Sequence, residues 1–358
     1  MKLRKLKKYY LYTRNEVFLG FLLKNKVLLN LSYKIFRLKG FIHSIKDVPF
    51  EKKEIIEFNA APDEHIFNPT FFKRKDSHVF LARKVDKTLK RMLVGGQVNE
   101  CYEPLSAISP VKVSEADEFS ISWPADPRLF SASKRVLGVF NTGHSESPNR
   151  NFLFELDQTG RSISSLKEIV KLDRRAIEKN WGFFEYENEV YAVYSISPWV
   201  IVKLEKDVYD SSIINAKEVH RINWNSHLFE ENFGELRGGA SPFLYRGNFY
   251  YITQSHIKTF LGKIYFGSMI EFESKPPFRI KKVSSTPVFK LTKDEYLMQP
   301  EARLNKTLCS ALYPSSVNLE SCDSRITLGY GINDYRVGVR TYKFDLLLKQ
   351  LSKVDFIN

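Results

Sequence analysis

The stretch "DPRLFSASKRVLGVFNT", residues 126–142, contains two short apolar runs separated by a polar turn. Short runs rich in Val, Ile, Phe and Tyr between polar turns are typical of antiparallel β-strands. Runs like the second one recur at 78–85, 189–196, 248–256 and 325–332. Each follows a strand-like stretch that opens on a turn residue. These openings are "NPTFF" at Asn68, "DPRLF" at Asp126, "NWGFF" at Asn180, "SPFLY" at Ser241 and "YPSSV" at Tyr313.

The spacing of these openings, roughly 54 to 72 residues, suits a repeated four-stranded blade with its loops. We therefore predict an all-β fold, a five-bladed β-propeller over residues 61–358, preceded by a basic N-terminal extension, residues 1–60, that lies outside the repeat. The opening of every blade should then point toward one central cavity. Residues 343–351 are predicted to form a closing strand followed by a short helix. A two-sheet sandwich with an α/β partner is disfavoured, because strands do not alternate with helices and no GxGxxG or Walker pattern occurs.

The composition points to anionic partners in a reducing compartment. A formal net charge of +14 favours phosphates, nucleotides or acidic lipid headgroups. Because the basic residues are spread along the chain, we expect no specific nucleic-acid partner. The three cysteines, Cys101, Cys309 and Cys322, are too few for a disulfide framework and show no CxxC spacing. We therefore expect a cytoplasmic protein without a metal or another cofactor.

The N-terminal segment, residues 1–36, is basic and rich in apolar residues. Lys24 and Lys26 interrupt its apolar run, so no stretch reaches the roughly 20 residues of a membrane span. It also lacks the small-residue cleavage site of a signal peptide. Two interpretations stay open: an amphipathic element packed on the domain, which is favoured, or peripheral contact with the inner face of an anionic membrane.

Several strings resemble, in order and spacing, the inverting mannoside phosphorylases and the related β-mannosyltransferases over about residues 64–352. They are "ADPRLF", "EKNWGFF", "RGGASPFLYRGNFYYITQSH", "YFGSMIEFESKPPFRIKKVSSTPVF" and "YPSSVNLESCDSRITLGYGINDYRVGVRTYKFDLLL". Such a phosphorylase needs one carboxylic acid for the glycosidic oxygen, while inorganic phosphate attacks the opposite face of the anomeric carbon. Because phosphate is the nucleophile, the second carboxylate of an inverting hydrolase is unnecessary. Cations and hydrogen-bond donors that hold the anion are needed instead.

The resemblance assigns roles to three positions. Asp126, in its "DPR" setting, matches the catalytic aspartate, although Asp before Pro is also a common start of a turn. Lys179 of "EKNW" matches a phosphate-contacting lysine, and His256 falls where relatives carry a histidine beside the phosphate. Relatives often carry an acidic residue just before the catalytic aspartate, where this chain has Ala125.

Further candidates surround these three. Arg237 precedes two glycines that would let the backbone approach a ligand. The other candidates for phosphate contact are Arg128 and Arg150. Asp334 matches an aspartate that relatives use against sugar hydroxyls, with a plain hairpin turn as the alternative. The candidates for aromatic contact with a sugar are Trp181, Tyr194 and Tyr330, although most aromatic residues of so aromatic a chain must belong to the core.

The leading functional hypothesis is therefore a β-mannosyltransferase that uses GDP-mannose or mannose 1-phosphate to extend a surface or storage glycan. Asp126 would act as the base on the acceptor hydroxyl, while Lys179, Arg237 and His256 would stabilise the phosphate leaving group. By microscopic reversibility the same residues would serve a β-mannoside phosphorylase in glycan breakdown. A non-catalytic sugar-binding propeller is the third hypothesis, and Ala125 keeps it open.

Overall fold

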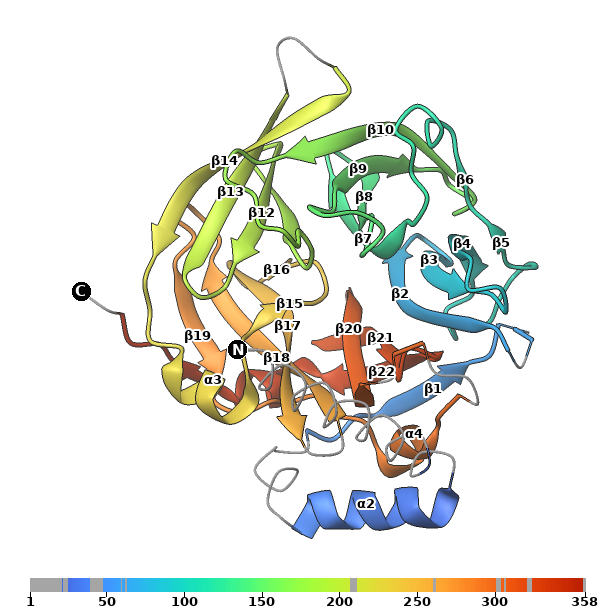
Figure 1. Cartoon of the computed structure of the whole chain (residues 1–358). Coiled ribbons are helices and arrows are strands. Elements are labelled where there is room, and N and C mark those ends of the chain that lie inside the picture. Colours follow the sequence, from blue (N-terminus) through green and yellow to red (C-terminus); the bar gives the residue numbers. More distant parts are fainter. Residues whose placement is uncertain are drawn as a thin grey trace, which may run out of the picture.

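The computed structural model describes residues 21, 25–38, 48–58, 60–61, 63–206, 211–259, 262–300, 304–305, 307–320 and 324–356. Strands dominate this part of the chain, so the predicted all-β class is confirmed. Figure 1 shows the strands standing in groups around a central region. The described helices are α2 (Lys26–Leu38), α3 (His227–Phe233), α4 (Lys293–Leu297) and α5 (Phe344–Leu348).

Antiparallel pairing joins strands that follow one another in the sequence. One group contains β2 (His65–Lys73), β3 (His78–Val85), β4 (Arg91–Val98) and β5 (Ser109–Pro110). The next contains β7 (Ala125–Ala132), β8 (Arg135–Asn141), β9 (Asn151–Leu156) and β10 (Ser162–Val170). A third contains β11 (Gly182–Tyr186), β12 (Glu189–Ser195), β13 (Trp199–Lys206) and β14 (Ile213–Ile222).

The remaining strands form two more groups. One contains β15 (Arg237–Gly238), β16 (Phe243–Tyr245), β17 (Asn248–Thr259), β18 (Gly262–Glu273) and β19 (Ile280–Ser284). The other contains β20 (Leu308–Glu320), β21 (Arg325–Ile332), β22 (Arg336–Lys343) and β1 (Lys52–Ile56). Two short strands flank the groups: β6 (Lys112–Val113) and β23 (Leu351–Lys353). Parallel pairs, β10 with β14 and β18 with β20, link neighbouring groups into larger sheets.

The two ends of the chain differ from the prediction. The segment predicted as a closing strand and then a helix forms α5 first and β23 afterwards. The outer partner of β22 is instead β1, which pairs with it antiparallel from Lys52 opposite Thr341 to Ile56 opposite Val337. Residues from the predicted N-terminal extension thus complete the last group of strands. Local sequence patterns do not reveal a strand partner so distant along the chain.

Helix α2 lies against α4 and the buried core through one face. Leu29 is 1% exposed, and the ring of Tyr33 lies 5.2 Å from that of Tyr296. The Ser32 hydroxyl lies 3.1 Å from the Tyr296 hydroxyl. This packing agrees with the favoured interpretation of an amphipathic element, although residues 1–20 lie outside the described ones. Among the helices that the structure describes, none is long and apolar enough to cross a membrane.

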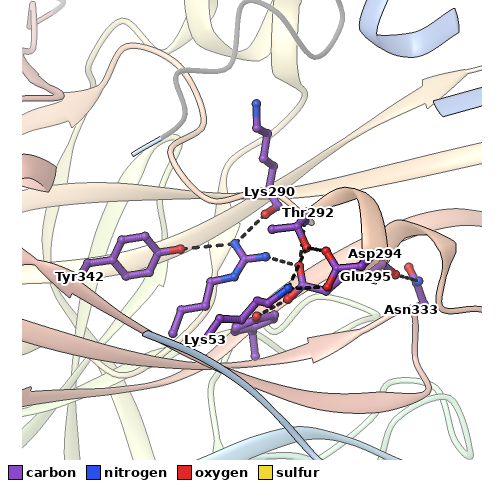
Figure 2. Close-up of polar contacts among 9 residues, drawn as sticks. Lys53, Lys290, Thr292, Asp294, Glu295, Asn333 and Tyr342 are labelled. Atoms are coloured by element: carbon purple, nitrogen blue, oxygen red, sulfur yellow. Dashed lines mark hydrogen bonds and ion pairs between the residues drawn. The ribbon is translucent and has the colours of Figure 1, made fainter. Parts of the chain in front are cut away.

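A buried ion pair connects α4 to the last group of strands. Arg340 on β22 is 3% exposed and pairs with Glu295 on α4, which is fully buried. The other carboxylate oxygen of Glu295 accepts the Tyr330 hydroxyl at 2.6 Å. Glu295 also accepts the backbone N–H of Thr292 at 2.8 Å, which completes a capping box at the start of α4. Figure 2 shows Thr292, Asp294 and Asn333 around Glu295 in this network.

The same network holds the turn between β21 and β22. The Asn333 amide donates to the carbonyl oxygens of Glu295, at 3.0 Å, and Met298, at 2.7 Å. Its own carbonyl accepts the N–H of Ala311 at 2.9 Å. The backbone of the neighbouring Asp334 is therefore fixed from three sides. This matters because Asp334 faces the cavity described next.

Candidate functional site

A cavity of about 390 Å³ lies where the strand groups meet. Its titratable side chains come from several groups of strands and from the loops between them. They are Arg83, Arg91, Asp126, His144, Lys179, Arg237, Tyr265, Tyr313 and Asp334. The cavity thus gathers two carboxylates among a larger number of cations. We refer to it as the inner cavity.

Asp126 lies in a β-bulge inside strand β7. The β7–β8 pairing shifts register between Ala125 and Arg128, which leaves Asp126 and Pro127 outside the ladder. Asp126 has a left-handed φ of 51°, a conformation that Asp and Asn tolerate better than other non-glycine residues. A bulge redirects a side chain that a regular strand would point elsewhere. The local distortion and the functional position therefore coincide: the "DP" pair makes the bulge, and the bulge turns the carboxylate into the cavity.

The Asp126 carboxylate is held ionised by its neighbours. Its side chain is only 14% exposed, and its Oδ1 accepts the Asn68 amide at 2.8 Å. Arg83 Nη1 lies 3.6 Å from the same oxygen. Burial opposes ionisation, but the positive charges of Arg83 and Arg128 outweigh it, so the pKa of Asp126 is lowered. At neutral pH Asp126 is a proton acceptor.

Three other strand openings meet Asp126 at the centre. Asn68 lies at a bulge of β2, where the β2–β3 register shifts between Phe67 and Thr70. Asn180 precedes β11 with a φ of 64° and accepts the Tyr313 hydroxyl at 2.7 Å. Tyr313, on β20, in turn accepts a hydrogen bond from Arg128 at 3.0 Å. The structure therefore brings together the openings at Asn68, Asp126, Asn180 and Tyr313.

Asp334 faces the same cavity from a hairpin turn. Asn333 and Asp334 both have left-handed φ values, 54° and 52°, as the central residues of a tight β-hairpin turn require. Burial raises the pKa of Asp334 to about 6, although Arg83 opposes the shift. The two carboxylates are thus driven apart in acidity, with Asp126 ionised and Asp334 close to half protonated in mildly acidic solution. A protonated Asp334 can donate a hydrogen bond to a sugar hydroxyl.

Replacing Asp334 by Asn should make stability less dependent on pH. A proton binds Asp334 more tightly in the folded than in the unfolded chain. Below about pH 4 Asp334 is protonated in both states, so its ionisation does not reduce the free energy of unfolding. Above about pH 6 it is ionised in both states, and the reduction is complete. The shift corresponds to about 3 kcal/mol at most. We expect the free energy of unfolding of Asp334→Asn, relative to the wild type, to rise by up to that amount between pH 4 and pH 8. Urea unfolding at both pH values measures it, and a constant difference would contradict the raised pKa.

Lys179 enters the cavity from a turn that a buried carboxylate holds in place. Glu178 is 3% exposed and accepts the Trp181 indole N–H and the Tyr194 hydroxyl, both at 3.1 Å. Its backbone is clamped by Asn149, whose amide donates to the Glu178 carbonyl at 2.8 Å. These contacts fix the backbone on either side of Lys179. The side chain of Lys179 remains directed toward the inner cavity, which it lines.

A second cavity, of about 520 Å³, adjoins the first, and we call it the outer cavity. Six residues line both cavities: His144, Lys179, Asn180, Arg237, Tyr265 and Asn305. His256 and Tyr194 line the outer cavity only. One continuous space therefore contains the three residues predicted to contact phosphate: Lys179, Arg237 and His256. Lys179 and Arg237 lie where the two cavities join.

Four predicted site residues lie elsewhere. Arg128 is 4% exposed and donates to the carbonyls of Gly239 and Pro127, so its guanidinium serves the fold. Trp181 borders a void of about 20 Å³ beside Arg128 and is otherwise buried. Arg150 pairs with Glu146 and Glu168 and lines neither cavity. Tyr330 is fully buried against Glu295. Arg128, Arg150, Trp181 and Tyr330 thus line neither cavity, and their assigned contacts with phosphate or sugar stay predictions.

Several lining residues were given no role by sequence reasoning, although three of them are strand openings that it placed toward the central cavity. Asn68, Asn180 and Tyr313 occupy the same opening position as Asp126, so the repeat itself carried the signal. Arg83, in the second strand of its group, had no such signal and is found only in three dimensions. Among the residues that the structure describes, no group of three or more His, Cys, Asp and Glu side chains could hold a metal ion.

Solved structures with this arrangement of strands include proteins that act on mannosides. A mannose phosphorylase from Leishmania mexicana, solved with a phosphate ion, aligns with a TM-score of 0.55 at 11% identity, over 91% of this chain and 98% of that one. The fold is shared with mannoside phosphorylases. The resemblance inferred from the sequence strings is thus confirmed at the level of the fold.

Two further structures support this conclusion. A GDP-mannose-dependent mannosyltransferase from Leishmania mexicana aligns with a TM-score of 0.54 at 10% identity, over 89% of this chain and 98% of that one. A β-1,2-mannobiose phosphorylase from Listeria innocua, solved with β-1,2-mannobiose, aligns with a TM-score of 0.54 at 11% identity, over 86% and 95%. No family model and no curated protein sequence matches this chain. At 10–11% identity these neighbours show a shared fold, and they leave the reaction of this chain open.

Proposed function

We propose that this protein is an inverting glycosyltransferase that moves a mannose-type sugar from a phosphorylated donor to a glycan hydroxyl, and that its five groups of strands are propeller blades. Asp126 removes the proton from the acceptor hydroxyl as that oxygen attacks the anomeric carbon. The bond from the anomeric carbon to the donor phosphate breaks, and its electron pair leaves with the phosphate. Lys179 and Arg237 stabilise the charge that develops there.

The observation that carries this proposal is the distribution of charge in the inner cavity. Asn68 lies on β2 and Asp126 on β7, whereas Lys179 comes from the turn before β11 and Arg237 from β15. A sugar between them would present one face of its anomeric carbon to the carboxylate and the other to the cations. That is the arrangement that inversion with a phosphate leaving group requires, and it needs only one catalytic carboxylate.

The protonation of Asp126 supports one direction of transfer over the other. A phosphorolytic enzyme needs this group protonated at the start, whereas synthesis needs it ionised. Because the pKa of Asp126 is lowered by Arg83 and Arg128 despite burial, the ionised form predominates at neutral pH. This favours synthesis from GDP-mannose or mannose 1-phosphate over glycan breakdown. Ala125 bears little on the choice, since it is 1% exposed and faces the core.

Three parallel incubations test the proposal: GDP-mannose with a β-mannoside acceptor, mannose 1-phosphate with the same acceptor, and a β-mannoside with inorganic phosphate. We expect a longer mannoside from one of the first two, with β configuration at the new bond by NMR. Consumption in the third alone would make the protein a phosphorylase. No turnover in any of them, together with retained mannoside binding, would make it a non-catalytic sugar-binding protein.

A further inference from the structure

The outer cavity has a lining that a single phosphate does not explain. Beyond Lys179 and Arg237 it adds the cationic side chains of Arg175, Lys258 and Lys263. The one acidic residue in its lining is Glu235, which already pairs with Arg237 at 2.8 Å. Within the described chain, Lys179, Lys258 and Lys263 form no ion pair. The outer cavity therefore carries an uncompensated positive charge.

Two of these lysines face each other across a hairpin. Lys258 on β17 lies directly opposite Lys263 on β18 in an antiparallel register. Like charges directly opposite on neighbouring strands destabilise a sheet. Burial and then the charges of Lys258 and Arg237 lower the pKa of Lys263. A polyanion between the two ammonium groups would remove this cost.

The hairpin also connects the two cavities. Because alternate residues of a strand share a face, Gln254, His256 and Lys258 lie on one side of β17, opposite Gly267, Tyr265 and Lys263 of β18. Gln254 lines the inner cavity, Tyr265 lines both, and Lys258 lines the outer one. The rings of His256 and Tyr265 stack at 4.8 Å between them. One face of this hairpin thus runs from the sugar position outward to the two lysines.

The side on which the outer cavity opens indicates which substrate enters it. Asp126, Asn68 and Arg83 line the inner cavity and are absent from the lining of the outer one. The outer cavity joins the inner one at Lys179 and Arg237, where the proposed leaving group lies. A group in the outer cavity is therefore attached to the donor phosphate and not to the acceptor.

We propose that the outer cavity binds a second phosphoryl group, held by Lys258, Lys263 and Arg175, so that the leaving group of the donor is a diphosphate. The link to sugar transfer rests on the proposed function, whereas the anion site itself does not. Arg175 is suited to this role because its guanidinium is oriented by Ser195, 3.0 Å away, and by the Tyr194 ring, 5.0 Å away. Ile177, Ile196 and Leu236 supply apolar wall for whatever the diphosphate carries.

Calorimetric titration with two simple anions tests the site without any reaction. The probes are inorganic phosphate and pyrophosphate at constant ionic strength, and the variant is Lys258→Gln/Lys263→Gln. A charge-assisted hydrogen bond contributes enough for about tenfold in affinity each. We expect the variant to lose about 100-fold in pyrophosphate affinity and to bind inorganic phosphate as the wild type does. Lys112→Gln/Lys217→Gln, two exposed lysines outside both cavities, removes the same charge and should change neither.

Equal loss of pyrophosphate binding in both double variants, or none in either, would overturn the assignment. The single variant Lys258→Gln, at an exposed position, keeps the test available if the double variant fails to fold. Competition by GDP and by geranyl diphosphate distinguishes a nucleoside from a lipid as the group beyond the second phosphoryl. If neither compound binds as tightly as pyrophosphate, the proposed diphosphate site is also overturned. If none of the donors is turned over but pyrophosphate binding depends on Lys258 and Lys263, the function is wrong and the anion site stands.

Discussion

Asp126→Asn should lower the rate of sugar transfer by about 1,000-fold, since a positioned general base contributes typically 10²- to 10⁴-fold. The amide keeps the shape of the carboxylate and an oxygen that can accept the hydrogen bond from Asn68. Asn also tolerates the left-handed φ of 51° at this bulge. Stability and donor binding should therefore stay near the wild-type values while turnover falls. Initial rates, together with thermal unfolding of both proteins, measure the two effects separately.

Asp117→Asn serves as the matched control, because Asp117 is exposed and lines neither cavity. Its transfer rate should equal that of the wild type. Unchanged turnover in Asp126→Asn would remove Asp126 from the chemistry. Equal losses of turnover and stability would instead give it a purely structural role at the bulge.

Arg340→Met should destabilise the protein by about 3 to 5 kcal/mol, because it leaves the buried Glu295 carboxylate without its cationic partner. The loss should reach the site as well, since Asn333 binds the backbone of the same helix next to Asp334. Figure 2 shows Asn333 next to Glu295. Chemical denaturation gives the free energy of unfolding.

Two companion variants decide how this loss is interpreted. Arg340→Met/Glu295→Gln removes both charges and should recover part of the stability, because the uncompensated charge is the larger cost. Arg221→Met breaks the exposed pair with Glu218, 52% and 33% exposed, and should cost less than about 1 kcal/mol. Equal losses in Arg340→Met and Arg221→Met would show that burial adds nothing to the pair.

The strand repeat could be predicted from the sequence because it depends on local patterns. Apolar runs between polar turns identified β3, β8, β12, β17 and β21 from their residue types alone. The spacing of the openings then placed Asp126 at the centre, where the structure has it. The partner of β22 could not be found in this way, because β1 has no turn or repeat that relates it to the end of the chain.

Cavity residues that belong to a strand opening could be predicted from the sequence. Residues whose place depends on the direction of their side chain could not. Arg128 and Asp126 are two residues apart in one bulged strand, yet Asp126 enters the cavity while Arg128 binds backbone carbonyls. Lys258 and Lys263 look like ordinary surface lysines in the sequence. Only their antiparallel register brings them opposite each other. Spacing predicts which strand a residue is on, whereas bulges and register determine which way it points.

The pairing of β1 with β22 has a consequence for synthesis of the chain. Translation releases β1 before β22, so the edge of β1 has no native strand to bind while the strands between them are being made. Unpaired strand edges are sites of aggregation. Lys52, Lys53 and Glu54 place charges along this edge, and such charges discourage pairing with other nascent chains. The last group of strands is therefore completed only after β22 has been made, and the charges of β1 protect its unpaired edge until then.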